Sequence, residues 1–143
     1  LPSTYMNAKN GILQKRAESD IATEMCRKLR VKTPSYEKIV NQLSGGNQQK
    51  VIIAKWLMMY PKVLILDEPT RGIDVGAKSE IYQIMNELTE QGVSIIMISS
   101  DMEEIMGMAD RILVMCEGKI SGELHKGEYT QEKILEYAAE VKK

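Results

Sequence analysis

Two short stretches of the chain carry residues that could handle a phosphate group or a metal ion. The first is LSGGNQQK at positions 43–50, in which Ser44 can cap a following helix by bonding a backbone N–H two or three residues on. Gly45 and Gly46 let a backbone come close to an anion, and the N-terminus of a helix offers free N–H groups and a partial positive charge. The stretch therefore fits either a phosphate site or a plain helix cap without a ligand.

The second stretch is VLILDE at positions 63–68, an apolar run that ends in Asp67 and Glu68. Such a run is typical of a strand buried on both faces of a parallel sheet, and α/β proteins bind ligands at the C-terminal edge of such strands. Adjacent strand residues point in opposite directions, so the two carboxylates serve different tasks. One can hold Mg²⁺, usually through water, and the other can reach an attacking water. Carboxylates are also common after surface strands, so the pair alone does not identify a site.

The elements that must position these stretches alternate between helix and strand. The patterns predict helices over about 15–30, 36–43, 46–60 and 77–91, strands over 63–68 and 93–100, a short helix after Asp101, a hairpin turning at 117–119, and a last helix from Thr130 to about Val141. This order favours an α/β fold with a parallel sheet and right-handed crossovers.

Two of the predicted helices show clear inward faces. In the helix over 77–91 the inward residues are Ile81, Ile84, Met85 and Leu88, with Gly92 as the C-terminal stop. In the short helix they are Met102, Ile105, Met106 and Ala109, and Asp101 with Glu104 has the spacing of a capping box.

Composition excludes several classes of protein. The chain has 143 residues, 43% apolar and 27% charged, with a net charge of −1, which argues against a broad surface for nucleic acid. No apolar run approaches the length of a membrane span. Cys26 and Cys116 are expected to be reduced and structural, and His125 is expected in a surface loop rather than in a metal site.

The two stretches occur in a fixed order, separated by one helix, and in that order they resemble the C-terminal part of an ATP-binding-cassette (ABC) ATPase. LSGGNQQK looks like the signature motif of that family, VLILDE like its Walker B strand with the catalytic glutamate, and PTRGID like its D-loop region. ISSD, at 98–101, sits where the family has its switch segment. The resemblance covers about residues 43–124, and it is nearest to the second cassette of the tandem ATPases of ribose- and galactose-type sugar importers.

The resemblance implies a fold and a domain division. The fold would be a partial three-layer P-loop NTPase with a mostly parallel sheet, a C-terminal β-hairpin and an N-terminal helical segment. Residues 1–43 would be the end of the helical subdomain, and residues 44–143 would be the signature and Walker B part of the ATPase core.

The resemblance also implies roles for individual residues. Those that would contact the γ-phosphate of a nucleotide held by the opposite cassette are Ser44, Gly45 and Gly46. Asp67 would hold Mg²⁺, and Glu68 would orient or deprotonate the attacking water. Asp74 would connect the two sites across the cassette dimer. The implied cofactors are therefore ATP and Mg²⁺.

The sequence departs from the family pattern in two places. Most of the family has a histidine in the switch segment that contacts the γ-phosphate, whereas the aligned residue here is Ser100, which is shorter and uncharged. The Walker A loop, G-x-x-x-x-G-K followed by Ser or Thr, is also missing. Gly122 and Gly127 have its spacing, but Glu128 follows where lysine is required. We therefore expect the chain to be the later half of a cassette.

The function implied by the resemblance is sugar import driven by binding and hydrolysis of Mg-ATP. The expected partners are an opposing cassette, membrane permease subunits and, indirectly, a sugar-binding protein, with no nucleic acid. The expected location is the cytoplasmic side of the membrane, as a peripheral subunit. The chain alone is expected to bind ATP weakly, to be inactive and to self-associate, because a sheet without its Walker A strand leaves an edge and apolar surface unpaired.

Two alternatives remain open at this point. One is a lobe of a DNA-repair-type ABC ATPase, which usually carries long coiled coils; no sustained heptads occur here. The other is a degenerate cassette that keeps the fold as an interaction module without catalysis. The missing Walker A loop and Ser100 favour the second alternative, whereas the retained Glu68 favours a catalytic ancestor.

Overall fold

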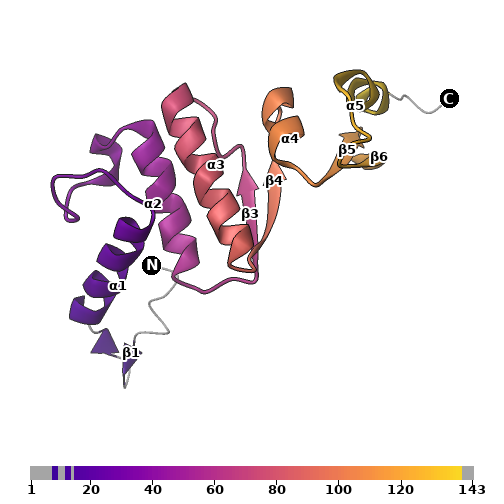
Figure 1. The fold of residues 1–143 in the computed structure, drawn as a ribbon. Coiled ribbons are helices and arrows are strands. Elements are labelled where there is room, and N and C mark those ends of the chain that lie inside the picture. Colours follow the sequence, from indigo (N-terminus) through magenta and orange to yellow (C-terminus); the bar gives the residue numbers. More distant parts are fainter. Residues whose placement is uncertain (1–7, 10–11, 14, 140–143) are drawn as a thin grey trace. The chain divides into compact units, whose positions relative to one another are not determined.

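The computed structural model describes residues 8–9, 12–13 and 15–139, and its elements follow the alternation expected from the sequence (Figure 1). The helices are α1 (Lys15–Lys28), α2 (Gly45–Leu57), α3 (Val75–Glu90), α4 (Met102–Met108) and α5 (Gln131–Ala138), with a 3₁₀ turn at Val40–Gln42. The strands are β1 (Ala8–Lys9), β2 (Ile12–Leu13), β3 (Val63–Asp67), β4 (Ser94–Ile98), β5 (Arg111–Cys116) and β6 (Lys119–His125). The predicted helix over 36–43 is wrong in extent, because only the 3₁₀ turn forms there.

The chain divides into two compact units, Leu1–Ile98 and Ser99–Lys143. The first contains both stretches singled out above, and the second contains Ser100 and the hairpin. The division of this chain into residues 1–43 and 44–143 stays a prediction.

The sheet of the first unit is parallel, as the sequence predicted. β3 pairs with β4 in register, with Leu64 opposite Ile95 and Leu66 opposite Met97. The crossover between the two strands is α3, which packs against β4. In Figure 1, α1, α2 and α3 lie in succession on one side of these strands. The helical layer therefore covers a single face of the sheet.

The prediction that β3 is buried on both faces is wrong for this chain. Leu64 and Leu66 are 4% and 5% exposed, but Ile65 between them is 64% exposed. β4 alternates in the same way, with Ile96 and Ile98 about half exposed. A continuous apolar run is required only where both faces are covered, and here the second face is apolar but open.

The helix α3 confirms the inward face predicted from its periodicity. Its buried residues are Ile81, Ile84, Met85 and Leu88. The helix begins earlier than predicted because the Asp74 carboxylate accepts a hydrogen bond from the Ala77 N–H at 2.9 Å, which caps its first turn. After the helix, Gly92 has a φ of +86°, a conformation that glycine adopts without strain.

The second unit is an antiparallel hairpin, β5–β6, with α5 packed on it and side chains of α4 packed against the same core. Its buried cluster is Ile112, Val114, Leu124 and Ile134, against which Met102, Ile105, Met106, Ala109, Tyr129 and Tyr137 pack. Thr130 caps α5 as predicted, and Asp101 caps α4 by accepting from the N–H groups of Glu103 and Glu104. The Glu104 carboxylate itself is buried and accepts a hydrogen bond from the Ser99 hydroxyl.

His125 lies at the surface as expected, but it is the last residue of β6 rather than part of a loop. Both cysteines are free and half-buried, and burial raises the pKa of the Cys26 thiol. His125 is exposed, with its Nε2 3.6 Å from a carboxylate oxygen of Glu123. In the part of the chain that the structure describes, no helix is both long and apolar enough to cross a membrane.

Candidate functional site

The turn before α2 presents a helix N-terminus to the surface. Ser44 is exposed at the N-cap position with extended backbone angles. The first intrahelical bond runs from the Gln48 N–H to the Ser44 carbonyl at 2.9 Å. The N–H groups of Gly45, Gly46 and Asn47 therefore precede the helical ladder, where backbone donors have no intrahelical partner. This donor set fits an anionic oxygen.

The predicted cap by Ser44 is wrong in its bonding. The Ser44 side chain makes no hydrogen bond to the backbone of α2. Its Oγ instead accepts a hydrogen bond from the side-chain amide of Asn47 at 2.8 Å. The reason is that Asn47, one helical turn further on, offers a donor that reaches the hydroxyl directly.

Packing leaves no room for a side chain at Gly46 and little room at Gly45. A Cβ on Gly46 would lie 2.5 Å from the Ala77 Cβ, so the first turns of α2 and α3 touch at this point. A Cβ on Gly45 would lie 3.1 Å from Cγ2 of Ile73. The signature-like turn and the segment before α3 are thereby held against each other.

A hollow of about 330 Å³ lies between the N-terminal turns of α2 and α3. Its lining residues are Lys32, Ser44, Gly46, Asn47, Asp74, Gly76, Ala77 and Glu80. The lining carries one ammonium group and two carboxylates. Three of the residues predicted from the sequence, Ser44, Gly46 and Asp74, are thus brought together around one opening.

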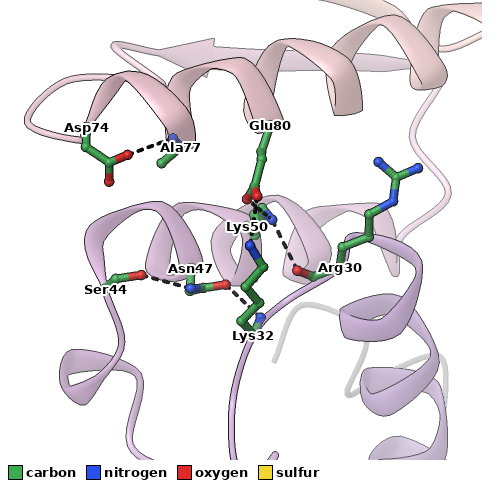
Figure 2. Close-up of polar contacts among 8 residues, drawn as sticks. All are labelled: Arg30, Lys32, Ser44, Asn47, Lys50, Asp74, Ala77 and Glu80. Atoms are coloured by element: carbon green, nitrogen blue, oxygen red, sulfur yellow. Dashed lines mark hydrogen bonds and ion pairs between the residues drawn. The ribbon is translucent and has the colours of Figure 1, made fainter.

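A buried lysine ties the helices together behind this hollow, as Figure 2 shows. The Lys50 side chain is 2% exposed, and its Nζ lies 2.6 Å from Oε2 of Glu80 and 3.1 Å from the Arg30 carbonyl oxygen. Lys32 reaches the other oxygen of the same carboxylate at 3.0 Å. These contacts lower the pKa of Glu80 to about 2, and the hydrogen bond from Lys50 has a larger effect than that from Lys32.

This ion pair was missed in the sequence. The signal that could have found it is the position of Lys50 on the inward face of α2, because Gly46, Ile53, Ala54 and Leu57 are buried there. A lysine at such a position needs a partner. The sequence alone does not show that the partner is Glu80, thirty residues further along the chain.

Asp67 and Glu68 stand at the C-terminal end of β3. Asp67 is the last residue of the strand and is exposed. Glu68 is half-buried, with a φ of +48°, and its N–H donates to the Ile98 carbonyl at 2.8 Å. A non-glycine residue in this conformation is strained, and such strain occurs often at functional sites.

The strand end can supply part of a magnesium site. Among the described residues, no group of three His, Cys, Asp or Glu side chains could hold a metal ion. An exposed carboxylate such as Asp67 nevertheless suits Mg²⁺, which usually keeps several waters and is bound through one or two carboxylates plus phosphate oxygens. Asp67 can therefore supply one protein ligand of such a site.

The structure does not bring all the predicted site residues together. Asp67 and Glu68 do not line the hollow beside Ser44. Ser100 is exposed and belongs to the second unit. The turn at Ser44, with its free N–H groups, and the carboxylate pair Asp67–Glu68 are therefore separate features of this chain.

Comparison with known proteins identifies relatives of the chain. A family model described as "ABC transporter" matches residues 2–71. The ribose import ATP-binding protein RbsA of Oceanobacillus iheyensis is 60% identical over 131 residues, which make up 92% of this chain and 26% of that protein. RbsA of Bacillus subtilis is 55% identical over 138 residues, 96% of this chain and 28% of that protein. The chain thus spans about a quarter of the length of these relatives.

Solved structures agree on the fold. A nucleotide-free ATP-binding cassette from an ABC transporter superposes with a TM-score of 0.77 at 24% identity, over 87% of this chain and 51% of that one. A dimeric, post-hydrolysis cassette, MJ0796 with ADP and Pi, gives 0.71 at 24% identity over 85% and 52%. The expected partial P-loop NTPase fold is confirmed, and neither alternative weighed from the sequence is favoured by these relatives.

Proposed function

The chain belongs to the ABC transporter family of ATP-binding cassettes, and from that premise we propose that it is part of an ATPase that powers import of ribose or a related sugar. The observation that carries the proposal is the pair of separate features in the first unit. One is a helix N-terminus with Ser44 beside it, and the other is a carboxylate pair at the end of β3. The identity of 60% to a ribose import ATP-binding protein supports the sugar class.

The separation of the two features suggests an assembly. We propose that two cassettes pair so that the Ser44 turn of one meets the γ-phosphate of ATP held by the other. The residues that contact the phosphate are Ser44, Gly45 and Gly46, through the hydroxyl and the leading N–H groups of α2. Asp74, which shares the hollow with Ser44 and caps α3, links the two sites across the pair. A dimeric cassette among the solved structures supports the pairing of two cassettes.

The chemistry assigned to the strand end is activation of water. Asp67 would hold Mg²⁺, which would offset the charge of the phosphates. Glu68 accepts the proton of the attacking water or fixes its orientation. Its backbone N–H is held by the bond to the Ile98 carbonyl, which fixes the position of this residue at the end of β3.

The intact protein would then work as a peripheral subunit on the cytoplasmic side of the membrane, docked on permease subunits that receive sugar from a binding protein. Ser100 would stand at the switch position. A hydroxyl can donate a hydrogen bond to the phosphate but carries no charge, so hydrolysis at this site is expected to be slower than with a histidine.

The test is the substitution Glu68→Gln in the intact ATPase that contains this segment. ATPase activity is expected to fall about 100-fold or more, since a general base contributes at least that factor. ATP-driven pairing of cassettes, measured by sedimentation, is expected to persist because the amide keeps the size of the carboxylate. Ser100→His, assayed alongside, is expected to raise the rate.

The matched control is Glu117→Gln, because Glu117 is an exposed glutamate whose φ of +49° is close to the +48° of Glu68. This variant is expected to keep full activity. An ATPase rate that is unchanged by Glu68→Gln would contradict the catalytic role and would favour a cassette that acts as an interaction module.

A further inference from the structure

The Ser44 hydroxyl has its hydrogen-bonding direction set by a neighbour. The side-chain amide of Asn47 donates to Ser44 Oγ at 2.8 Å. A serine hydroxyl has one proton to donate and two lone pairs to accept with. Because Asn47 occupies a lone pair, the proton of Ser44 remains available to a separate acceptor.

The orientation of the Asn47 amide is itself fixed. The backbone N–H of Lys32 donates to Oδ1 of Asn47 at 2.7 Å. A backbone N–H can only donate, so the atom that faces it must be the amide oxygen, and the NH₂ group must then face Ser44. If the amide turned over, its NH₂ group would face the Lys32 N–H and that bond would be lost.

The backbone of Lys32 is tied to two helices. Its Nζ pairs with Glu80 of α3 at 3.0 Å. The buried Lys50 of α2 binds the same carboxylate and also the carbonyl of Arg30, two residues before Lys32. Figure 2 shows these contacts converging on the side of α2 that faces α3. The loop that carries the Lys32 N–H is thus held in place by the ion pairs that Lys32 and Lys50 form with Glu80.

We propose that Asn47 is a positioning residue that makes the Ser44 hydroxyl a donor toward a phosphate oxygen. The hydrogen bonds run in one direction, from the Lys32 N–H to Asn47, from Asn47 to Ser44, and from Ser44 outward. A chain of this kind polarises its members, which strengthens the last donor. The inference rests on the proposed contact between Ser44 and the γ-phosphate.

Aspartate at this position distinguishes orientation from packing. Asp has the shape of Asn and can still accept from the Lys32 N–H. Its second oxygen can only accept, however, so the Ser44 hydroxyl would donate its hydrogen bond to the introduced carboxylate. The lone pairs of Ser44 Oγ would then face the phosphate. Asn47→Asp therefore reverses the hydrogen bond between residues 47 and 44 while it preserves the bond from the Lys32 backbone. Asn47→Ala removes both hydrogen bonds without adding charge.

The experiment compares Ser44→Ala, Asn47→Asp, Asn47→Ala and the two double variants in the intact ATPase. The readouts are KM for ATP, kcat and the melting temperature. Each single variant is expected to raise KM about tenfold with little change in kcat, since one hydrogen bond to a charged group is lost. In the Ser44→Ala background, either change at Asn47 is expected to add less than about twofold, since residues that act through one contact are not additive.

The control is Asn86→Asp, the same chemical change at an exposed position on α3, which is expected to leave KM unchanged. If the changes at Asn47 keep their full effect on KM in the Ser44→Ala background, Asn47 acts through charge or packing and the inference is overturned. A fall in melting temperature that accounts for the loss in Asn47→Ala would also overturn it. If Ser44→Ala leaves KM unchanged, the proposed phosphate contact itself fails, which is a different result.

Discussion

The two faces of the β3–β4 sheet differ although their residues are similar. On one face Leu64 and Leu66 are almost fully buried beneath the helical layer, whereas on the other Val63 and Ile65 are 52% and 64% exposed. Exposed apolar patches of this kind usually mark a surface that meets another part of the protein. The comparison shows that helices cover only one face of this sheet in the chain. The turn at Ser44 belongs to the helices on that covered face.

The largest expected effect comes from the covered face. Leu66→Ala is expected to lower the free energy of unfolding by about 3 kcal/mol, because it leaves a cavity in a packed site. Ile65→Ala, one residue away on the open face, is expected to cost less than about 1 kcal/mol, since most of that side chain already meets water. Urea unfolding of the 143-residue chain, followed by circular dichroism, measures both. Equal losses would show that the open face is covered in solution.

A smaller effect is expected from the ion pairs that Glu80 of α3 forms with Lys50 and Lys32. The folded-state pKa of Glu80 is lowered from 4.5 to about 2, so its contribution to stability is present above about pH 4.5 and is lost as pH falls toward 2. The contribution is expected to be about 1 kcal/mol, less than the full shift implies, because the Glu80 side chain is 42% exposed.

The measurement is the difference in unfolding free energy between the chain and Glu80→Gln across pH 3–7. The difference is expected to shrink below about pH 4.5. Glu90→Gln, on an exposed part of the same helix, serves as the control and is expected to show no such trend. A difference that stays constant with pH would mean that the Lys50–Glu80 pair does not stabilise the fold.

The smallest expected change in stability, with a large change in association, comes from the open face. Ile65→Thr keeps the strand propensity and is expected to change the free energy of unfolding by under about 1 kcal/mol. It is expected to reduce self-association of the 143-residue chain, as measured by sedimentation over a concentration series, because less apolar surface remains to be covered. A parent chain that is monomeric at every concentration would contradict this prediction.

Local patterns predicted most of the fold, because periodicity and capping act over a few residues. The inward face of α3 and the Thr130 cap are examples. The exposure of Ile65 could not be predicted in the same way, because burial depends on what packs against a strand rather than on the strand itself. The same holds for Lys50, since its partner lies thirty residues further along the chain.

The candidate site was predicted as a set of residues and not as a geometry. The motifs pointed to Ser44, Asp67 and Glu68, but the bond from Asn47 to Ser44 replaces the backbone cap that the sequence suggested. The pattern Ser-Gly-Gly-Asn fits both arrangements, and only the position of the Lys32 N–H decides between them.

The close approach of Gly46 to Ala77 has a mechanical consequence. With no room for even one methyl group between them, the first turns of α2 and α3 cannot slide past each other. The contact therefore fixes how closely the Ser44 turn can approach the turn that begins at Asp74, and any larger side chain at position 46 would force the two turns apart.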